Sequence, residues 1–200
     1  SMEYVTIVST GNALLFGDLN LIRQNSTGAS NSTRGLWLGG QNPSASPVTV
    51  LNNIEMITLQ STGNTQEFGD LSGIAQACRS CASPTRALRF GGSTSGASGN
   101  RVQTIDYVTI STTGNAVQFG DLEAAAWFQG ACSNSTRCIH FGNNPATNVI
   151  DFITLATLGN AQDFGFLSET FQNCSAVSSS ILLVSILSYN WSITLMAKEE

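Results

Sequence analysis

Residues 3–19, EYVTIVSTGNALLFGDL, occur four times in this chain with small changes. The stretch returns as EMITLQSTGNTQEFGDL (55–71), DYVTISTTGNAVQFGDL (106–122) and DFITLATLGNAQDFGFL (151–167). The four copies start at acidic residues, Glu3, Glu55, Asp106 and Asp151, so the period is close to 50 residues. Internal repetition at such a period indicates a solenoid, a propeller or a similar repeat architecture.

The repeats divide the 200 residues into four units that we expect to form one domain over 1–200. The units are about 2–53, 54–104, 105–149 and 150–200, the last one degenerate. Hydrophobic residues make up 42% of the chain, charged residues only 10%, and there are 19 glycines. This composition favours short strands and tight turns over helices, so the predicted fold class is all-β.

The net charge of −5 comes with only eight Lys and Arg residues. Proteins that bind phosphate backbones or anionic membranes need a basic patch, and this sequence has none. We therefore expect neither nucleic acid nor a membrane as a partner. No segment near residue 1 has the basic, apolar and small-residue parts of a signal peptide.

The first half of each repeat alternates apolar and polar residues, which predicts a strand. A Gly-Asn pair follows, and we expect it to form a hairpin turn because Gly and Asn tolerate positive φ. The second strand of this hairpin contains a repeated phenylalanine that we expect to anchor the core: Phe16, Phe68, Phe119 and Phe164.

The second half of each of the first three repeats contains another short strand, as in RGLWLGG (34–40), RALRFGG (86–92) and RCIHFGN (137–143). Three pairs of large apolar residues share one predicted face of these strands: Leu36/Leu38, Leu88/Phe90 and Ile139/Phe141. The opposite face carries Trp37, Arg89 and His140 at one equivalent position. Because these three residues differ chemically, they do not indicate a shared active centre.

Four strands per unit of about 50 residues fit a propeller blade, and a ring of blades removes exposed sheet edges. An apolar strand ending in Gly-Gly (LWLGG), a variable linker, an acidic strand (IEMITL) and an aromatic strand (QEFGDL) resemble the kelch blade. The resemblance covers about residues 2–180, although the usual kelch Trp and Tyr are mostly replaced. It implies a kelch-like β-propeller of four blades.

The phrase IDYVTIxxTGNAxxFGDL resembles, more closely, repeats of tail-associated and other structural proteins of marine bacteriophages. This resemblance implies a non-enzymatic structural or adhesive module, with other virion proteins or host-surface glycans as partners and a virion or extracellular location. It supplies no catalytic or binding residues. The alternatives are a carbohydrate-binding, lectin-like propeller and, third, a hydrolase or oxidase. The sequence leaves monomer and homo-oligomer open.

The fourth repeat leaves the template after Ser180, where ILLVSIL (181–187) replaces the Thr-Arg and Gly-Gly segment. Val184 and Ile186 still fall where Leu36 and Leu38 fall. We therefore expect a substitute strand that completes the blade begun by residues 2–19 and closes the ring. Residues 191–196 predict one more strand. A membrane anchor over 181–197 is the weaker interpretation, because polar residues interrupt the run.

The inventory of catalytic and metal-binding residues is thin. Cys78 and Cys81 have CxxC spacing but neither a second CxxC nor a nearby histidine, so no metal site is predicted. Cys81 and Cys132 occupy equivalent positions that we expect to be small buried slots holding free thiols. His140 is the only histidine and we expect it to be structural. We predict no catalytic residue and no cofactor.

A final pattern concerns charge. An aspartate precedes an arginine by 16 residues in each of the first three repeats: Asp18 and Arg34, Asp70 and Arg86, Asp121 and Arg137. The fourth repeat has Phe166 and Leu182 instead, so both charges are lost together. Joint loss predicts that these residues form structural ion pairs within or between blades, since one partner left alone would be uncompensated. A charged ring around a central channel, binding an ion or sugar, is the functional alternative.

Overall fold

The computed structural model describes residues 1–95, 100–178 and 183–186. Within this part of the chain the protein consists of antiparallel β-strands joined by turns and loops, with no α-helix. The predicted all-β class is therefore confirmed. No helix of the described residues is long and apolar enough to cross a membrane, although part of the segment 181–197 lies outside them.

Three four-stranded antiparallel sheets form most of the structure. Sheet 1 has the order β3 (Thr27–Ser30), β4 (Arg34–Leu38), β7 (Asn53–Thr58), β8 (Gln66–Asp70). Sheet 2 consists of β9 (Arg79–Ala82), β10 (Arg86–Phe90), β11 (Thr104–Thr109) and β12 (Val117–Asp121). Sheet 3 consists of β13 (Gly130–Ser133), β14 (Arg137–Phe141), β15 (Thr147–Thr154) and β16 (Gln162–Phe171). Each sheet joins the second half of one repeat to the first half of the next.

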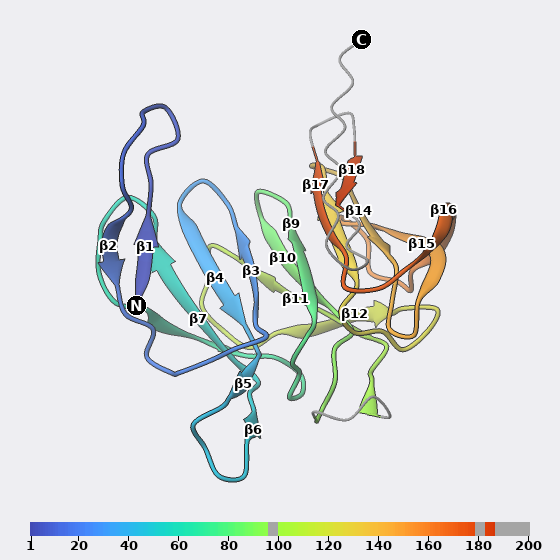
Figure 1. Ribbon diagram of the computed structural model, residues 1–200, viewed down its shortest axis with the longest axis horizontal. Coiled ribbons are helices and arrows are strands. Elements are labelled where there is room, and N and C mark those ends of the chain that lie inside the picture. Colours follow the sequence, from blue (N-terminus) through green and yellow to red (C-terminus); the bar gives the residue numbers. More distant parts are fainter. Residues whose placement is uncertain (96–99, 179–182, 187–200) are drawn as a thin grey trace.

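Two half-sheets flank this series. The N-terminal half-sheet is β1 (Met2–Tyr4) paired with β2 (Leu14–Gly17), which correspond to β7 and β8. The C-terminal half-sheet is β17 (Ser175–Ser178) paired with β18 (Leu183–Ile186), which correspond to β3 and β4. They lie on opposite sides of the molecule in Figure 1 and are not paired with each other. A small hairpin of β5 (Gln41–Asn42) and β6 (Thr49–Val50) occupies the first linker.

The strand at Val184 and Ile186 is thus present, paired with β17. The strand predicted over 191–196 lies outside the described residues.

The sheets pack face to face, and alternation along each strand decides which side chains meet. Leu36, Leu38, Ile54 and Phe68 of sheet 1 pack with Ala87 and Val108 of sheet 2. On the other face of sheet 2, Leu88, Phe90 and Ile105 pack with Cys138 and Ile153 of sheet 3. The predicted apolar face of the second-half strands is confirmed as core for Leu36, Leu38, Leu88, Phe90 and Phe141, whereas Ile139 is only half-buried.

The repeated phenylalanines are buried only where another sheet follows. Phe68 and Phe119 are 3% and 4% exposed, as predicted for core anchors. Phe16 is half-buried, and Phe164 is 52% exposed, so the prediction is wrong for Phe164. The physical reason is that, within the described residues, no outer strand pair covers β16 as β11–β12 covers β8 and β15–β16 covers β12.

The Gly-Asn pairs join neighbouring sheets at their outer strands. In the first such contact, the Gly63 N–H donates to the Phe16 carbonyl at 2.8 Å and the Asp18 N–H donates to Asn64 Oδ1 at 2.9 Å. Sheets 1 and 2 are joined in the same way by Gly114 and Asn115, and sheets 2 and 3 by Gly159 and Asn160. The pair therefore docks a loop onto the preceding Phe-Gly-Asp segment, which the hairpin-turn prediction did not include.

The inner strands are joined by serine hydroxyls. β9 lies beside β3 and β13, and β13 lies beside β17. Ser80 donates to the Gly28 carbonyl at 2.6 Å, Ser133 to the Ala82 carbonyl at 2.7 Å, and Ser178 to the Ser133 carbonyl at 2.6 Å. A serine hydroxyl thus bonds a carbonyl of the preceding inner strand at each step, although Ser80 lies two residues earlier in its repeat than Ser133 and Ser178 do.

Candidate functional site

Buried acidic residues recur at one position of each complete sheet. They are Glu55 on β7, Asp106 on β11 and Asp151 on β15, which begin the second, third and fourth repeats. The residues directly opposite on the adjacent strand are Trp37, Arg89 and His140. A buried carboxylate is stable only when it is paired or fully hydrogen-bonded, so each sheet needs a partner here.

In sheet 2 the partner comes from the opposite strand. Arg89 and Asp106 form an ion pair in which both side chains are 2% exposed or less. Arg89 Nη1 also donates to the carbonyls of Gly91 at 2.7 Å and Thr104 at 3.2 Å. The Ser72 hydroxyl of the preceding loop donates to the Asp106 carboxylate at 2.6 Å. The pair therefore fixes a loop of sheet 1 as well as two strands of sheet 2.

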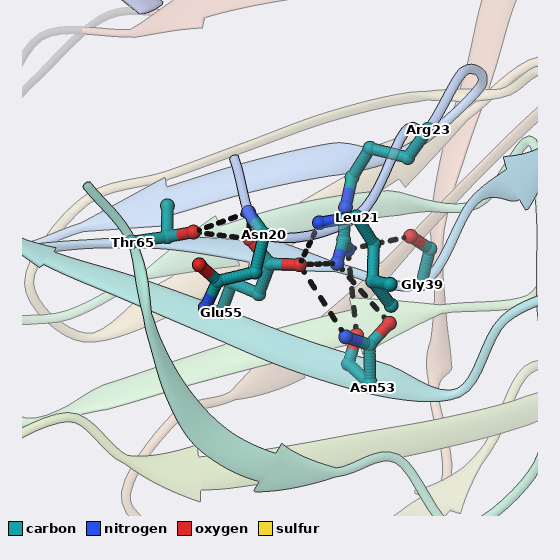
Figure 2. A network of polar contacts seen from close by, with 7 residues as sticks. All are labelled: Asn20, Leu21, Arg23, Gly39, Asn53, Glu55 and Thr65. Atoms are coloured by element: carbon teal, nitrogen blue, oxygen red, sulfur yellow. Dashed lines mark hydrogen bonds and ion pairs between the residues drawn. The ribbon is translucent and has the colours of Figure 1, made fainter. Parts of the chain in front are cut away.

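In sheet 1 the opposite residue is Trp37, and a different arginine supplies the charge. Arg23 reaches in from the loop between β2 and β3 and pairs with Glu55 at 2.5 Å (Figure 2). Its Nη1 donates to the carbonyls of Gly39 at 2.9 Å and Asn53 at 3.5 Å, the residues equivalent to Gly91 and Thr104. The same guanidinium position is therefore filled from two different places in the sequence.

Further donors surround the Glu55 carboxylate. The Thr65 hydroxyl donates at 2.5 Å, and the N–H groups of Asn20 and Leu21 each donate at 3.1 Å (Figure 2). Burial alone would raise the pKa of Glu55, but Thr65, Arg23 and the Asn20 N–H together hold this pKa below its usual value. Glu55 therefore stays ionised and ties the loop after the N-terminal half-sheet to sheet 1.

Sheet 3 has a weaker version of this arrangement. His140 Nδ1 lies 3.7 Å from Asp151 Oδ2, which is too long for a hydrogen bond. Both nitrogens of His140 and Oδ1 of Asp151 are buried without a hydrogen-bond partner in the described part of the chain. The carboxylates of Glu55 and Asp106 have no such orphaned oxygen. His140, predicted to be structural, thus lies in the least satisfied of three equivalent sites.

The predicted Asp–Arg pairs do not form. None of Arg34, Arg86 and Arg137 makes an ion pair with Asp18, Asp70 or Asp121, all of which the structure describes. Arg34 donates to the Ile110 carbonyl at 2.9 Å and Arg86 to the Leu155 carbonyl at 2.7 Å, each in the next sheet. Arg86 and Arg137 also lie 4.8 Å above the rings of Tyr107 and Phe152.

Sheet topology explains why these charges stay apart. The aspartates lie at or just beyond the end of an outer strand, and the arginines begin a second strand, so a whole strand or a sheet boundary separates them. The aspartates use their backbone for the outer contacts, and Asp18 also pairs with the N-terminal amine at 3.5 Å. The three aspartates still hold sheets together through their backbone N–H groups, and Arg34 and Arg86 do so by donating to backbone carbonyls.

The cysteines contribute to packing. Cys81 of β9 and Cys138 of β14 form a disulfide between sheets 2 and 3, with their Cα atoms 6.5 Å apart. The prediction of a free thiol at Cys81 is therefore wrong, because alternation points both side chains into one intersheet core. Cys78, Cys132 and Cys174 are free and buried. Burial raises the pKa of Cys132 and of Cys174 to about 11, which makes them poor nucleophiles.

A groove of about 880 Å³ lies between the N-terminal half-sheet and sheet 1. One wall is β1 with Phe16, and the other contains Trp37, Ile57 and Leu59. Polar atoms enter at one end from the segment 60–62, and Ser133 of β13 reaches the inner side. In each complete sheet the strand equivalent to β1 is hydrogen-bonded on both edges, whereas among the described strands β1 has β2 as its single partner. The groove therefore occupies the place where an inner strand pair would lie.

Within the described ranges, no group of three or more His, Cys, Asp and Glu residues is placed to hold a metal ion.

The sequence analysis noted the recurring acids and the series Trp37, Arg89 and His140 but did not pair them, and it missed Arg23. A signal was available for two of the three sheets, because Asp106 and Asp151 recur in repeats that carry Arg89 and His140 at one equivalent position. No protein-family model matches the chain, and no similar protein was found among curated sequences.

Proposed function

We propose that the chain is a non-enzymatic structural or adhesive module, built as a four-bladed β-propeller whose fourth blade combines the two half-sheets. The observation that carries this proposal is that the half-sheets are complementary. β17–β18 corresponds to the inner pair of a sheet and β1–β2 to the outer pair. Joining them would give four equivalent sheets from four repeats.

The register of this junction follows from the three complete sheets. Leu38 lies opposite Ile54, Phe90 opposite Ile105, and Phe141 opposite Ile150. The equivalent residues at the ends of the chain are Ile186 and Met2, so Ser185 would lie opposite Glu3. Glu3 is the residue equivalent to Glu55, Asp106 and Asp151, and it is exposed. In the described structure it has a strand partner on the β2 side and none on the opposite edge of β1.

The outer edge supports the same junction. Phe164 and Phe166 of β16 are 52% and 68% exposed, and a Cβ at Gly165 would meet nothing. At the other end, Gly11 and Asn12 form the one Gly-Asn pair of the four repeats that docks on no described residue. In the proposed ring, this loop would dock on Phe164 and Gly165 as Gly159 docks on Phe119.

The structural role follows from how the repeated residues are used. Buried acids, second-strand arginines, serines and Gly-Asn pairs all make contacts between or within sheets. The virion or surface setting rests on the sequence resemblance to phage structural repeats. A disulfide between sheets supports an oxidising environment outside the cytosol.

Removal of residues 181–200 tests the closed ring on which this proposal rests. The truncated protein lacks β18, so the N-terminal half-sheet keeps an unpaired edge and an open groove. We expect loss of cooperative thermal unfolding and self-association in size-exclusion chromatography. Truncation of 187–200 is the matched control, because it leaves β17–β18 in place, and should unfold cooperatively as a monomer. A 181–200 truncation that stays monomeric and equally stable would contradict the proposal.

A lectin-like role is a second candidate, favoured by the groove itself. Its volume lies within the range of about 300–1,000 Å³ for ligand pockets, and Trp37 offers an aromatic face beside polar side chains. A glycan array separates the two candidates. Glycan binding that is lost on Trp37→Ala would favour the lectin, whereas a closed ring would fill the groove with β17–β18 and bind no glycan there.

A further inference from the structure

The least satisfied group in the described core is the pair of His140 and Asp151 in sheet 3. The two side chains are 8% and 6% exposed. Three of their polar atoms, His140 Nδ1, His140 Nε2 and Asp151 Oδ1, have no hydrogen-bond partner in the described structure. Leaving buried polar groups unpaired costs stability, which points to a missing partner at this position.

The backbone around Asp151 has the conformation that holds a guanidinium in the other two sheets. Gly39, Gly91 and Gly142 have φ values of 60°, 53° and 65°. Their N–H groups donate to the carbonyls of Asn53, Thr104 and Val149 at 3.2, 3.1 and 3.4 Å. In sheet 1, Arg23 Nη1 donates to the carbonyls of Gly39 and Asn53. In sheet 2, Arg89 Nη1 donates to those of Gly91 and Thr104. In sheet 3 the matching carbonyls are those of Gly142 and Val149.

Neither source of the guanidinium is available in sheet 3. The strand position of Arg89 is His140, which is too short, and the loop position of Arg23 is Ala126. The hydroxyl donors are also gone, because Ser72 corresponds to Glu123 and Thr65 to Ala161. The site keeps the acceptors and loses both the arginine and the side-chain hydroxyls that satisfy them in the other two sheets.

We propose that this site binds a small monovalent cation, of the class of ammonium, sodium or potassium, in place of the guanidinium. The Asp151 carboxylate, the carbonyls of Gly142 and Val149, and His140 Nδ1 would surround it. The separation of 3.7 Å between Nδ1 and Oδ2 leaves both atoms free to contact one ion. A single positive charge matches the single carboxylate, as in sheets 1 and 2, whereas a dication would leave an uncompensated charge in a buried place.

Thermal unfolding in different salts tests the site. The full chain is unfolded at constant ionic strength in ammonium, sodium or potassium chloride, with tetramethylammonium chloride as the ion too large to enter. At a small-cation concentration 100-fold above Kd, we expect the Tm to rise by roughly 5–10 °C over the tetramethylammonium value. Equal Tm values in all four salts would overturn the proposal.

Three variants assign the effect to this site. His140→Arg should fill the site and remove the cation dependence, and Asp151→Asn should remove it without adding bulk. Arg89→His should create a second site in sheet 2 and steepen the dependence. A cation effect that persists in Asp151→Asn would overturn the assignment, even if His140→Arg failed to fold. A crystal structure grown in potassium buffer that shows a water molecule and no potassium ion among these four groups would also overturn it.

Discussion

Replacing Arg89 with methionine is expected to destabilise the protein by about 3–5 kcal/mol, because the Asp106 carboxylate would remain buried without its cation. Both side chains are 2% exposed or less, and Arg89 also satisfies the carbonyls of Gly91 and Thr104. Urea unfolding of the Arg89→Met variant measures the loss. Arg137→Met is the matched control, since Arg137 is exposed and makes no ion pair in the described structure, and should cost less than about 1 kcal/mol.

The double variant Arg89→Met/Asp106→Leu distinguishes the net contribution of the ion pair to stability from the cost of leaving Asp106 buried and unpaired. Replacing both members of a buried pair with apolar residues of similar size is often neutral or stabilising. We therefore expect the double variant to recover most of the stability lost in Arg89→Met. A double variant as unstable as the sum of the single changes would show that these residues act independently.

Replacing Gly120 with alanine is expected to weaken the contact between sheets 2 and 3. A Cβ at Gly120 would overlap the Gly159 carbonyl oxygen, so the loop that docks sheet 3 onto sheet 2 would have to move. The move would also strain the Gly159 N–H to Phe119 carbonyl bond of 3.0 Å and the Asp121 N–H to Asn160 bond of 3.1 Å. We expect a loss of about 3 kcal/mol from the overlap and the weakened hydrogen bonds.

Gly73→Ala is the control for this change. Gly73 is exposed, has no neighbour within 4 Å of an added Cβ, and has no positive φ. Its replacement should leave the unfolding midpoint within the scatter of the wild-type protein. If Gly120→Ala were equally harmless, the Gly-Asn contact would not be what holds the outer strands of neighbouring sheets together.

Much of the fold could be predicted from the repeat and from alternation. The period of about 50 residues indicated four strands per unit, and the apolar positions Leu36, Leu88 and Phe90 were correctly placed in the core. These predictions succeed because burial on one strand face is a local property of the sequence. Exposure at Phe164 could not be predicted in this way, because it depends on whether another sheet lies beside β16.

The polar contacts were harder to predict because they depend on register and topology. Asp70 and Arg86 recur at constant spacing, yet they belong to different sheets. The Asp70 backbone N–H donates to Asn115 Oδ1, and the Arg86 side chain donates to the Leu155 carbonyl. Arg23 has no counterpart at its own position in the other repeats, but its guanidinium lies where that of Arg89 lies. Spatial equivalence without sequence equivalence is invisible to a comparison of repeats. The disulfide likewise joins two positions that are not equivalent, on different strands.

If β18 completes the sheet begun by β1, the two strands can be cross-linked in the predicted register. The Glu3→Cys/Ser185→Cys variant places two thiols directly opposite each other in the proposed fourth blade. After mild oxidation, peptide mapping should find a 3–185 disulfide in a species that runs as a monomer without reductant. The off-register pair Asn12→Cys/Ser185→Cys should not cross-link. A 3–185 bond found only in dimers, or none at all, would contradict the closed four-bladed ring.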